Sequence, residues 1–158
     1  MHIENGSDGG AAEWVALDSL VPWDDNPREN EHAVPEVAKS LQRFGWGSVI
    51  LARKETRQVI AGHTRMKAAR ALGMTKAPVR FLDITEPEAK ALALADNKLG
   101  ELADWDNEAL GDVLRSLQAD GCSLDDLGWL TSELGSILTE PEPEPFGEVD
   151  EDELETEH

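Results

Sequence analysis

One stretch of the sequence, residues 58–72, dictates a strand that passes through a glycine into a helix. Residues 59–61 form a short apolar run of the kind that builds a buried strand, and Gly62 follows at once. Residues 64–72 then predict a helix that ends before a second glycine. Thr64 is the expected N-cap, because its hydroxyl can accept from the free amides of the first turn. This arrangement fixes the centre of the fold.

A glycine turn that opens a helix after a strand is typical of an anion site. The first amides of the helix have no partner within the helix, and the positive end of its dipole points the same way. His63 and Arg65 add side-chain donors, and an arginine can hold a phosphate through two parallel hydrogen bonds. Gly62, His63, Thr64 and Arg65 are therefore predicted to bind a phosphate or nucleotide. A tight turn, a structural histidine and a solvated arginine are the alternatives.

The charges are divided along the chain, although the formal net charge is −19. All 14 lysines and arginines lie within residues 28–115, together with 13 acidic residues. Residues 43–80 contain nine basic residues and one acidic residue. The sequence therefore predicts a basic face suited to phosphates, between two acidic ends. An ordinary solvated surface is the other interpretation.

Turn and cap signals divide the chain into an α+β domain and three shorter segments. A strand near the N-terminus, a helix from Pro35, the hairpin over 49–61 and a strand over 77–82 precede helices capped by Thr85 and Asp106. Pro-Glu alternation and an acidic run close the sequence, and such segments bury too little apolar surface to fold. The predicted division is a disordered N-terminus (1–13), a compact domain (14–118), a helical extension (119–139) and a disordered acidic tail (140–158).

Composition indicates a cytoplasmic protein. The sequence contains no apolar run of the roughly 18 residues that a membrane span needs, and its N-terminus lacks the order of a signal peptide. The single cysteine, Cys122, excludes an internal disulfide. We therefore expect a reducing compartment and no membrane partner.

The order of these elements resembles the ParB/sulfiredoxin-like domain. The likeness rests on an Asn26-Pro27-Arg28 loop before the first helix and on Gly62-His63-Thr64-Arg65 before the second. Further segments resemble the branch found at the front of phage and bacterial DNA methyltransferases and as stand-alone phage proteins: residues 94–99, 105–110 and 124–134. The resemblance covers about residues 14–139 and implies a small mixed sheet with helices.

What the resemblance implies is a nucleotide site at the glycine turn. The ligand is CTP with Mg²⁺ in ParB partition proteins, which clamp DNA, whereas relatives phosphorylate free serine or reduce oxidised cysteine, so ATP or ADP is also expected. By the same likeness, Arg28 belongs to the pocket, and Asp96 and Asn97 hold the metal and the triphosphate. The alternative for Asp96 and Asn97 is the end of a helix before Gly100.

The sequence also departs from the family pattern. His63 stands where sulfiredoxins carry their cysteine, so sulfiredoxin activity is not expected. Thr64-Arg65 replaces a pair of arginines, and the arginine that follows the Glu-Asn pair in ParB has no counterpart after Asn97. The Asp/Asn-Pro-Pro-aromatic motif of DNA methyltransferases is missing, so the chain does not methylate DNA alone. Either a stand-alone protein or the front half of a fusion fits the sequence.

Three functions follow from the sequence. The first is a DNA-associated accessory domain that binds a nucleotide and assists a DNA methyltransferase or another phage DNA-processing protein. The second is an enzyme on the same scaffold, namely a nucleotide hydrolase (CTPase), a nuclease or a small-molecule kinase. The third is an interaction module with a vestigial phosphate site. DNA is the expected macromolecular partner, a homodimer is left open, and no catalytic residue is assigned.

Overall fold

A mixed sheet with helices on both faces forms the main body of the protein. The computed structural model describes residues 10–139, so the two predicted disordered ends lie largely outside the described residues (1–9 and 140–158). The elements of the described part are, in order, β1 (Glu13–Ala16), η1 (Leu17–Ser19), η2 (Glu31–Ala33), α1 (Val34–Phe44), β2 (Ile50–Arg53), β3 (Val59–Ala61), α2 (His63–Ala71), β4 (Lys76–Leu82), α3 (Glu86–Glu101), α4 (Asn107–Ala119) and α5 (Thr131–Leu138).

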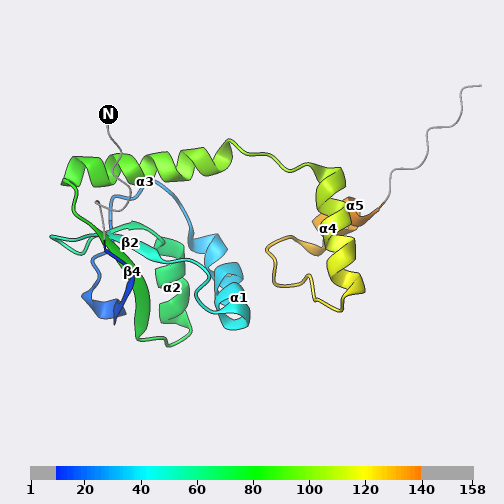
Figure 1. Cartoon of the computed structure of the whole chain (residues 1–158), viewed down its shortest axis with the longest axis horizontal. Coiled ribbons are helices and arrows are strands. Elements are labelled where there is room, and N and C mark those ends of the chain that lie inside the picture. Colours follow the sequence, from blue (N-terminus) through cyan, green and yellow to red (C-terminus); the bar gives the residue numbers. More distant parts are fainter. Residues whose placement is uncertain (1–9, 140–158) are drawn as a thin grey trace, which may run out of the picture.

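The sheet confirms the predicted α+β class. Its strand order is β1-β4-β2-β3; β2 and β4 run parallel, and the other two pairs are antiparallel. The predicted hairpin is the β2–β3 pair. Val21 forms a parallel bridge with Gln58 beside β3, so the chain enters the following loop next to the glycine turn. Figure 1 shows α1 and α2 side by side against the sheet and α3 running across its other side.

Alternation along the strands produces two hydrophobic cores. In β3, Val59 faces the larger core and Ile60 the smaller one, because successive strand residues point to opposite faces. The larger core joins the sheet to α1 and α2 and includes Ile50 and Met66. The smaller core joins the sheet to α3 through Ala89, Ala93 and their neighbours. The glycine turn therefore lies where both cores meet.

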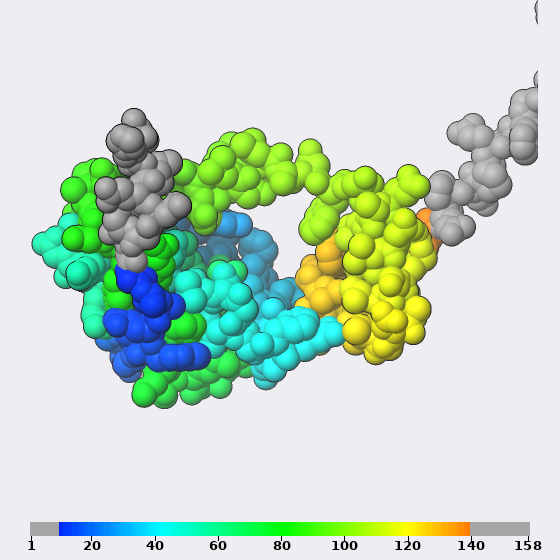
Figure 2. All heavy atoms as spheres, in the orientation of Figure 1, coloured from blue at the N-terminus to red at the C-terminus, as the bar shows by residue number. Residues whose placement is uncertain are grey.

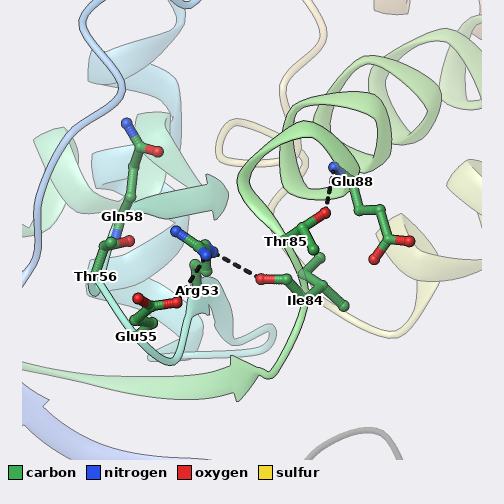
Figure 3. Close-up of polar contacts among 7 residues, drawn as sticks. All are labelled: Arg53, Glu55, Thr56, Gln58, Ile84, Thr85 and Glu88. Atoms are coloured by element: carbon green, nitrogen blue, oxygen red, sulfur yellow. Dashed lines mark hydrogen bonds and ion pairs between the residues drawn. The ribbon is translucent and has the colours of Figure 1, made fainter.

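Polar contacts around Arg53 fix the start of α3 (Figure 3). The Arg53 side chain is 13% exposed, pairs with Glu55 at 2.9 Å and donates from Nε to the Ile84 carbonyl at 2.7 Å. Thr85 then caps α3 as predicted, because its hydroxyl accepts from the Glu88 amide at 3.3 Å. These contacts join the β2–β3 hairpin to the β4–α3 connection and orient the helix that forms one wall of the site.

Helix α3 is longer than the sequence indicated. It continues to Glu101, so the prediction that Asp96 and Asn97 end a helix before Gly100 is wrong. The last two turns extend beyond the sheet (Figure 1), and Leu99 in this part of the helix is 63% exposed. Within residues 10–139, no helix combines the length and apolar character needed to cross a membrane.

Helices α4 and α5 form a separate small core. It contains four buried leucines, Leu110, Leu114, Leu124 and Leu134. One contact to the main body is the hydrogen bond from Arg43 on α1 to the Ser123 carbonyl, 2.8 Å long. The predicted boundary between 118 and 119 stays a prediction, but α4 packs with α5 rather than with the sheet (Figure 1). Residues 123–130 are irregular and lead into α5.

Candidate functional site

The junction of β3 and α2 is built on a glycine that no other residue could replace without strain. Gly62 is the N-cap of α2 and has the left-handed angles φ 99° and ψ 20°. A Cβ at this position would lie 3.1 Å from Ile50 Cγ1 and 3.3 Å from Ile50 Cα. The prediction that Thr64 caps the helix is wrong, because α2 begins at His63 and no side chain caps it. Its first-turn amides thus lack a side-chain acceptor.

All seven sequence-predicted site residues line one pocket of about 350 Å³. They come from three parts of the fold: the loop before α1, the start of α2 and the middle of α3. These residues are Arg28, Gly62, His63, Thr64, Arg65, Asp96 and Asn97. Figure 2 shows a gap bordered by α3, by the blue-to-cyan segment that leads into α1 and by the α4–α5 part; α3 and the segment before α1 also contribute residues to the pocket. Their roles remain predictions, but the structure brings them together.

Arg65 is distinguished from the other basic residues of the predicted face. Most of the basic residues in 43–80 are bound to protein oxygens, for example Arg53 to Glu55 and Arg70 to the Leu17 carbonyl. Within residues 10–139, the Arg65 side chain makes no hydrogen bond or ion pair, and the same holds in this segment for the side chains of Lys54, Lys76 and Arg80. Of these four, Arg65 lines the pocket.

The loop that carries Arg28 is attached to α3. Arg28 donates from Nη1 to the Asn97 Oδ1 on α3, and Asn97 donates from Nδ2 to the Ala93 carbonyl at 3.0 Å. The Arg28 backbone amide also donates to Asn26 Oδ1 at 3.1 Å, which forms a tight Asx turn. Arg28 and Asn97 therefore close one side of the pocket as a pair.

His63 is a buried residue that lines the pocket. Its side chain lines the pocket, the residue is 8% exposed, and its Nε2 accepts from the Trp23 backbone amide at 3.4 Å. That acceptor role places the proton of a neutral ring on Nδ1. Burial, and secondly the neighbouring Lys67 ammonium, lower the pKa of His63. The histidine thus joins the loop after β1 to the start of α2, and its Nδ1 proton remains available as a donor.

Protonation of His63 should loosen the fold. The pKa of His63 is lowered in the folded protein, so below about pH 6.5 the unfolded chain binds a proton that the folded chain resists. We expect the free energy of unfolding to fall between about pH 6.5 and 5.5, by at most about 1.4 kcal/mol per pH unit from this group. Above about pH 7.5, where neither state holds the proton, this contribution should not vary. Denaturant unfolding across this range measures it.

His63→Gln is the matched control for that pH dependence. Glutamine offers an oxygen that can accept from the Trp23 amide, yet it does not titrate. The variant should lose the slope between about pH 6.5 and 5.5 that His63 contributes. An unchanged slope in the variant would assign the pH dependence to other groups.

The predicted metal ligands do not form a ready-made metal site. Within the described part of the chain, no three His, Cys, Asp or Glu residues gather closely enough to hold an ion. Asp96 is the only carboxylate among the pocket-lining residues, and Asn97 Oδ1 already accepts from Arg28. Mg²⁺ commonly binds one or two carboxylates together with substrate phosphates and water. The donor set therefore fits a metal that arrives with a polyphosphate, with Asp96 as its protein ligand.

Sequence reasoning missed two asparagines and an apolar wall. Asn26 and Asn30, from the loop before α1, both line the pocket. Ala33 and Val37 add apolar surface at the beginning of α1. Asn26 is the first residue of the Asn26-Pro27-Arg28 motif, but it was not predicted to be a site residue. Asn30 stands in a polar loop without periodicity. Its signal is tertiary: the hydrogen bond that it accepts from Lys67 spans 37 residues of sequence.

The family of the chain follows from its sequence. Residues 3–98 match the ParB N-terminal domain family, and the chain belongs to this family. The resemblance to a ParB-like domain is thereby confirmed. The narrower likeness to the methyltransferase-associated branch stays a prediction.

Two curated relatives of the chain are named as probable plasmid-partitioning proteins, and a third is named after a ParB-like nuclease domain. The probable plasmid-partitioning protein ParB of Deinococcus radiodurans is 29% identical over 139 residues, which are 85% of this chain and 47% of the relative. The protein of the same name from Thermus thermophilus is 35% identical over 96 residues, 60% of this chain and 32% of the relative. The chain thus spans about a third to a half of these proteins. The ParB-like nuclease domain-containing protein YnaK of Escherichia coli is 35% identical over 75 residues, 47% of this chain and 85% of the relative.

A solved structure shares the fold. It is the C-terminally truncated chromosome-partitioning protein ParB from Caulobacter crescentus, complexed with CTP-gamma-S. The TM-score is 0.59 and the sequence identity 19%, over 81% of this chain and 70% of that chain. At this identity the likeness establishes the ParB-like fold.

Proposed function

We propose that the chain is a nucleotide-binding domain that holds the phosphates of its ligand at the start of α2 and acts in association with DNA. The observation that carries the proposal is a pocket that joins an uncapped helix N-terminus to an arginine without a protein partner in residues 10–139. Free amides, the helix dipole and a guanidinium all favour negative charge at one place. Arg65 places a cation in the first turn of α2, where it opposes the helix dipole. A bound anion would explain this position.

CTP is the first ligand to test. The Caulobacter neighbour was crystallised with a CTP analogue, and partition proteins share this family, so CTP and Mg²⁺ rank ahead of ATP and ADP. We propose that Asp96 contacts the metal and that Arg28, paired with Asn97, lies near the phosphates. The pocket volume of about 350 Å³ is within the range of small-molecule sites. Assistance to a DNA-modifying partner remains part of the proposal.

Calorimetric titration with CTP, ATP and ADP, each with and without Mg²⁺, tests the nucleotide site. We expect saturable one-to-one binding of at least one nucleotide, strengthened by Mg²⁺. Phosphate release measured in the same samples distinguishes a binding domain from a hydrolase. If none of the three nucleotides binds at millimolar concentrations, the nucleotide-binding proposal is rejected in favour of the interaction-module hypothesis.

DNA association has a distinct electrostatic test. If basic side chains contact DNA phosphates, binding releases counterions, and affinity should fall more than about tenfold between about 50 and 200 mM salt. The side chains of Lys54, Lys76 and Arg80 lie outside the nucleotide pocket and make no hydrogen bond or ion pair within residues 10–139, so they are the first candidates for such contacts. Fluorescence anisotropy with a duplex of arbitrary sequence measures the effect. Binding that is unchanged over this range would remove DNA from the proposal.

A further inference from the structure

Two of the three asparagines that line the pocket, Asn26 and Asn30, present only their nitrogen groups to a ligand. Asn26 Oδ1 accepts from the Arg28 amide at 3.1 Å, and Asn30 Oδ1 accepts from Lys67 Nζ at 2.9 Å. Both partners are obligate donors, so each amide orientation is determined by its neighbour. The Nδ2 groups of both residues donate to no atom within residues 10–139.

Asn30 is the more informative of the two. The residue is only 6% exposed, and a buried amide without a partner is costly. In the described part of the chain, Trp23 Nε1 is the only fully buried side-chain nitrogen or oxygen without a hydrogen-bond partner. Asn30 Nδ2 also has no partner there, so it is not fully buried. The nitrogen therefore reaches the open space of the pocket that Asn30 lines. A nearly buried donor, held in place and directed into a cavity, indicates a ligand contact.

Lys67 holds this amide without reaching the pocket itself. It lies one helical turn after His63 on α2 and contacts both Asn30 and Glu31, whereas neither Lys67 nor Glu31 lines the pocket. The ammonium can only donate, so it forces the Asn30 oxygen toward α2 and the nitrogen away from it. The geometry thus separates a residue that contacts the ligand from a residue that orients it.

We propose that Asn30 donates to an unprotonated oxygen of the bound ligand and that Lys67 is its positioning residue. This inference rests on the proposed nucleotide function and refines it, because Asn26 and Asn30 select ligands that present acceptors on this side. The acceptor is either a phosphate oxygen or a carbonyl of the base. Inorganic tripolyphosphate, which has no base, distinguishes the two sources.

Titrations of CTP and of inorganic tripolyphosphate at pH 8, where His63 is neutral, test the proposal. Asn30→Ala should weaken CTP binding about tenfold, the value of one hydrogen bond to a charged group. Asn30→Asp keeps an oxygen for Lys67 but replaces the donor by an acceptor, so it should weaken binding about 100-fold while the melting temperature is maintained. Glu31→Gln removes the negative charge of the other Lys67 partner but keeps an acceptor oxygen, and it should stay within about twofold of wild type.

The positioning role has its own readout. Lys67→Met should weaken binding about as much as Asn30→Ala, Lys67→Arg should retain most of the affinity, and the double variant Asn30→Ala, Lys67→Met should bind no more weakly than Asn30→Ala alone. Additive losses would overturn the positioning role, and a folded Asn30→Asp variant with wild-type affinity would overturn the contact. Equal losses for CTP and tripolyphosphate assign a phosphate oxygen; a loss for CTP alone assigns the base. If wild type binds neither compound, the proposed function itself fails.

Discussion

Replacing Arg65 with glutamate should weaken nucleotide binding about 100-fold or more while making the unliganded fold slightly more stable. The loss of affinity reflects a charge-assisted contact of about 1.5–3 kcal/mol and the repulsion between the new carboxylate and the phosphates. The gain in stability reflects the helix dipole, because α2 has no acid in its first turn and Arg65 opposes the dipole there. We expect a rise of about 1–3 °C in melting temperature. Calorimetry and thermal unfolding measure the two effects.

Lys54→Glu provides the control for net charge. Lys54 is exposed on the β2–β3 turn, lies outside the pocket and undergoes the same change of charge. Its nucleotide affinity should remain within about threefold of wild type, since exposed charges at a distance are screened. An Arg65→Glu variant that melts several degrees lower than wild type would show that Arg65 supports the fold. A variant that still binds nucleotide normally would remove Arg65 from the site.

Gly62→Ala should destabilise the protein by about 2–4 kcal/mol. Alanine in the left-handed backbone conformation of Gly62 costs about 1 kcal/mol. Its Cβ would also lie 3.3 Å from Ile50 Cα, where the sheet backbone cannot easily move. Any shift that relieves this contact also displaces the first-turn amides of α2, so nucleotide affinity should fall in the molecules that remain folded. Urea unfolding measures the change in stability.

Gly73→Ala separates the two costs. Gly73 follows α2 with φ 75°, and a Cβ there would meet nothing within 4 Å. It should therefore cost only about 1 kcal/mol, for the backbone alone. Equal losses for Gly62→Ala and Gly73→Ala would show that the approach of Gly62 to β2 contributes nothing. Unimpaired binding in folded Gly62→Ala would contradict the link between this turn and the site.

Local sequence patterns predicted the elements that surround the site. The apolar run of β3, the glycine and the helix behind it are local signals, so the positions of Gly62 and Arg65 could be derived from residues 58–72 alone. Arg28 and Asp96 had no local signal, and only the resemblance to a family connected them with the glycine turn. The structure brings both to the same pocket, although each is 34 residues from Gly62 in the sequence.

Properties that depend on packing between distant segments could not be predicted. The oxygen of Asn30 is occupied because Lys67 reaches it, and the acceptor role of His63 arises because the Trp23 amide lies beside it. The predicted Thr64 cap failed for the opposite reason: the left-handed Gly62 starts the helix two residues earlier than the capping pattern indicated.

The start of α2 can be observed directly by recording backbone amide NMR spectra during titration with CTP and Mg²⁺. If phosphates bind at this helix end, the amide signals of residues 62–65 should shift most, in a saturable manner, and Asn30 side-chain amide signals should move with them. Saturable binding that leaves these signals in place, or that shifts signals elsewhere, would contradict the proposed site.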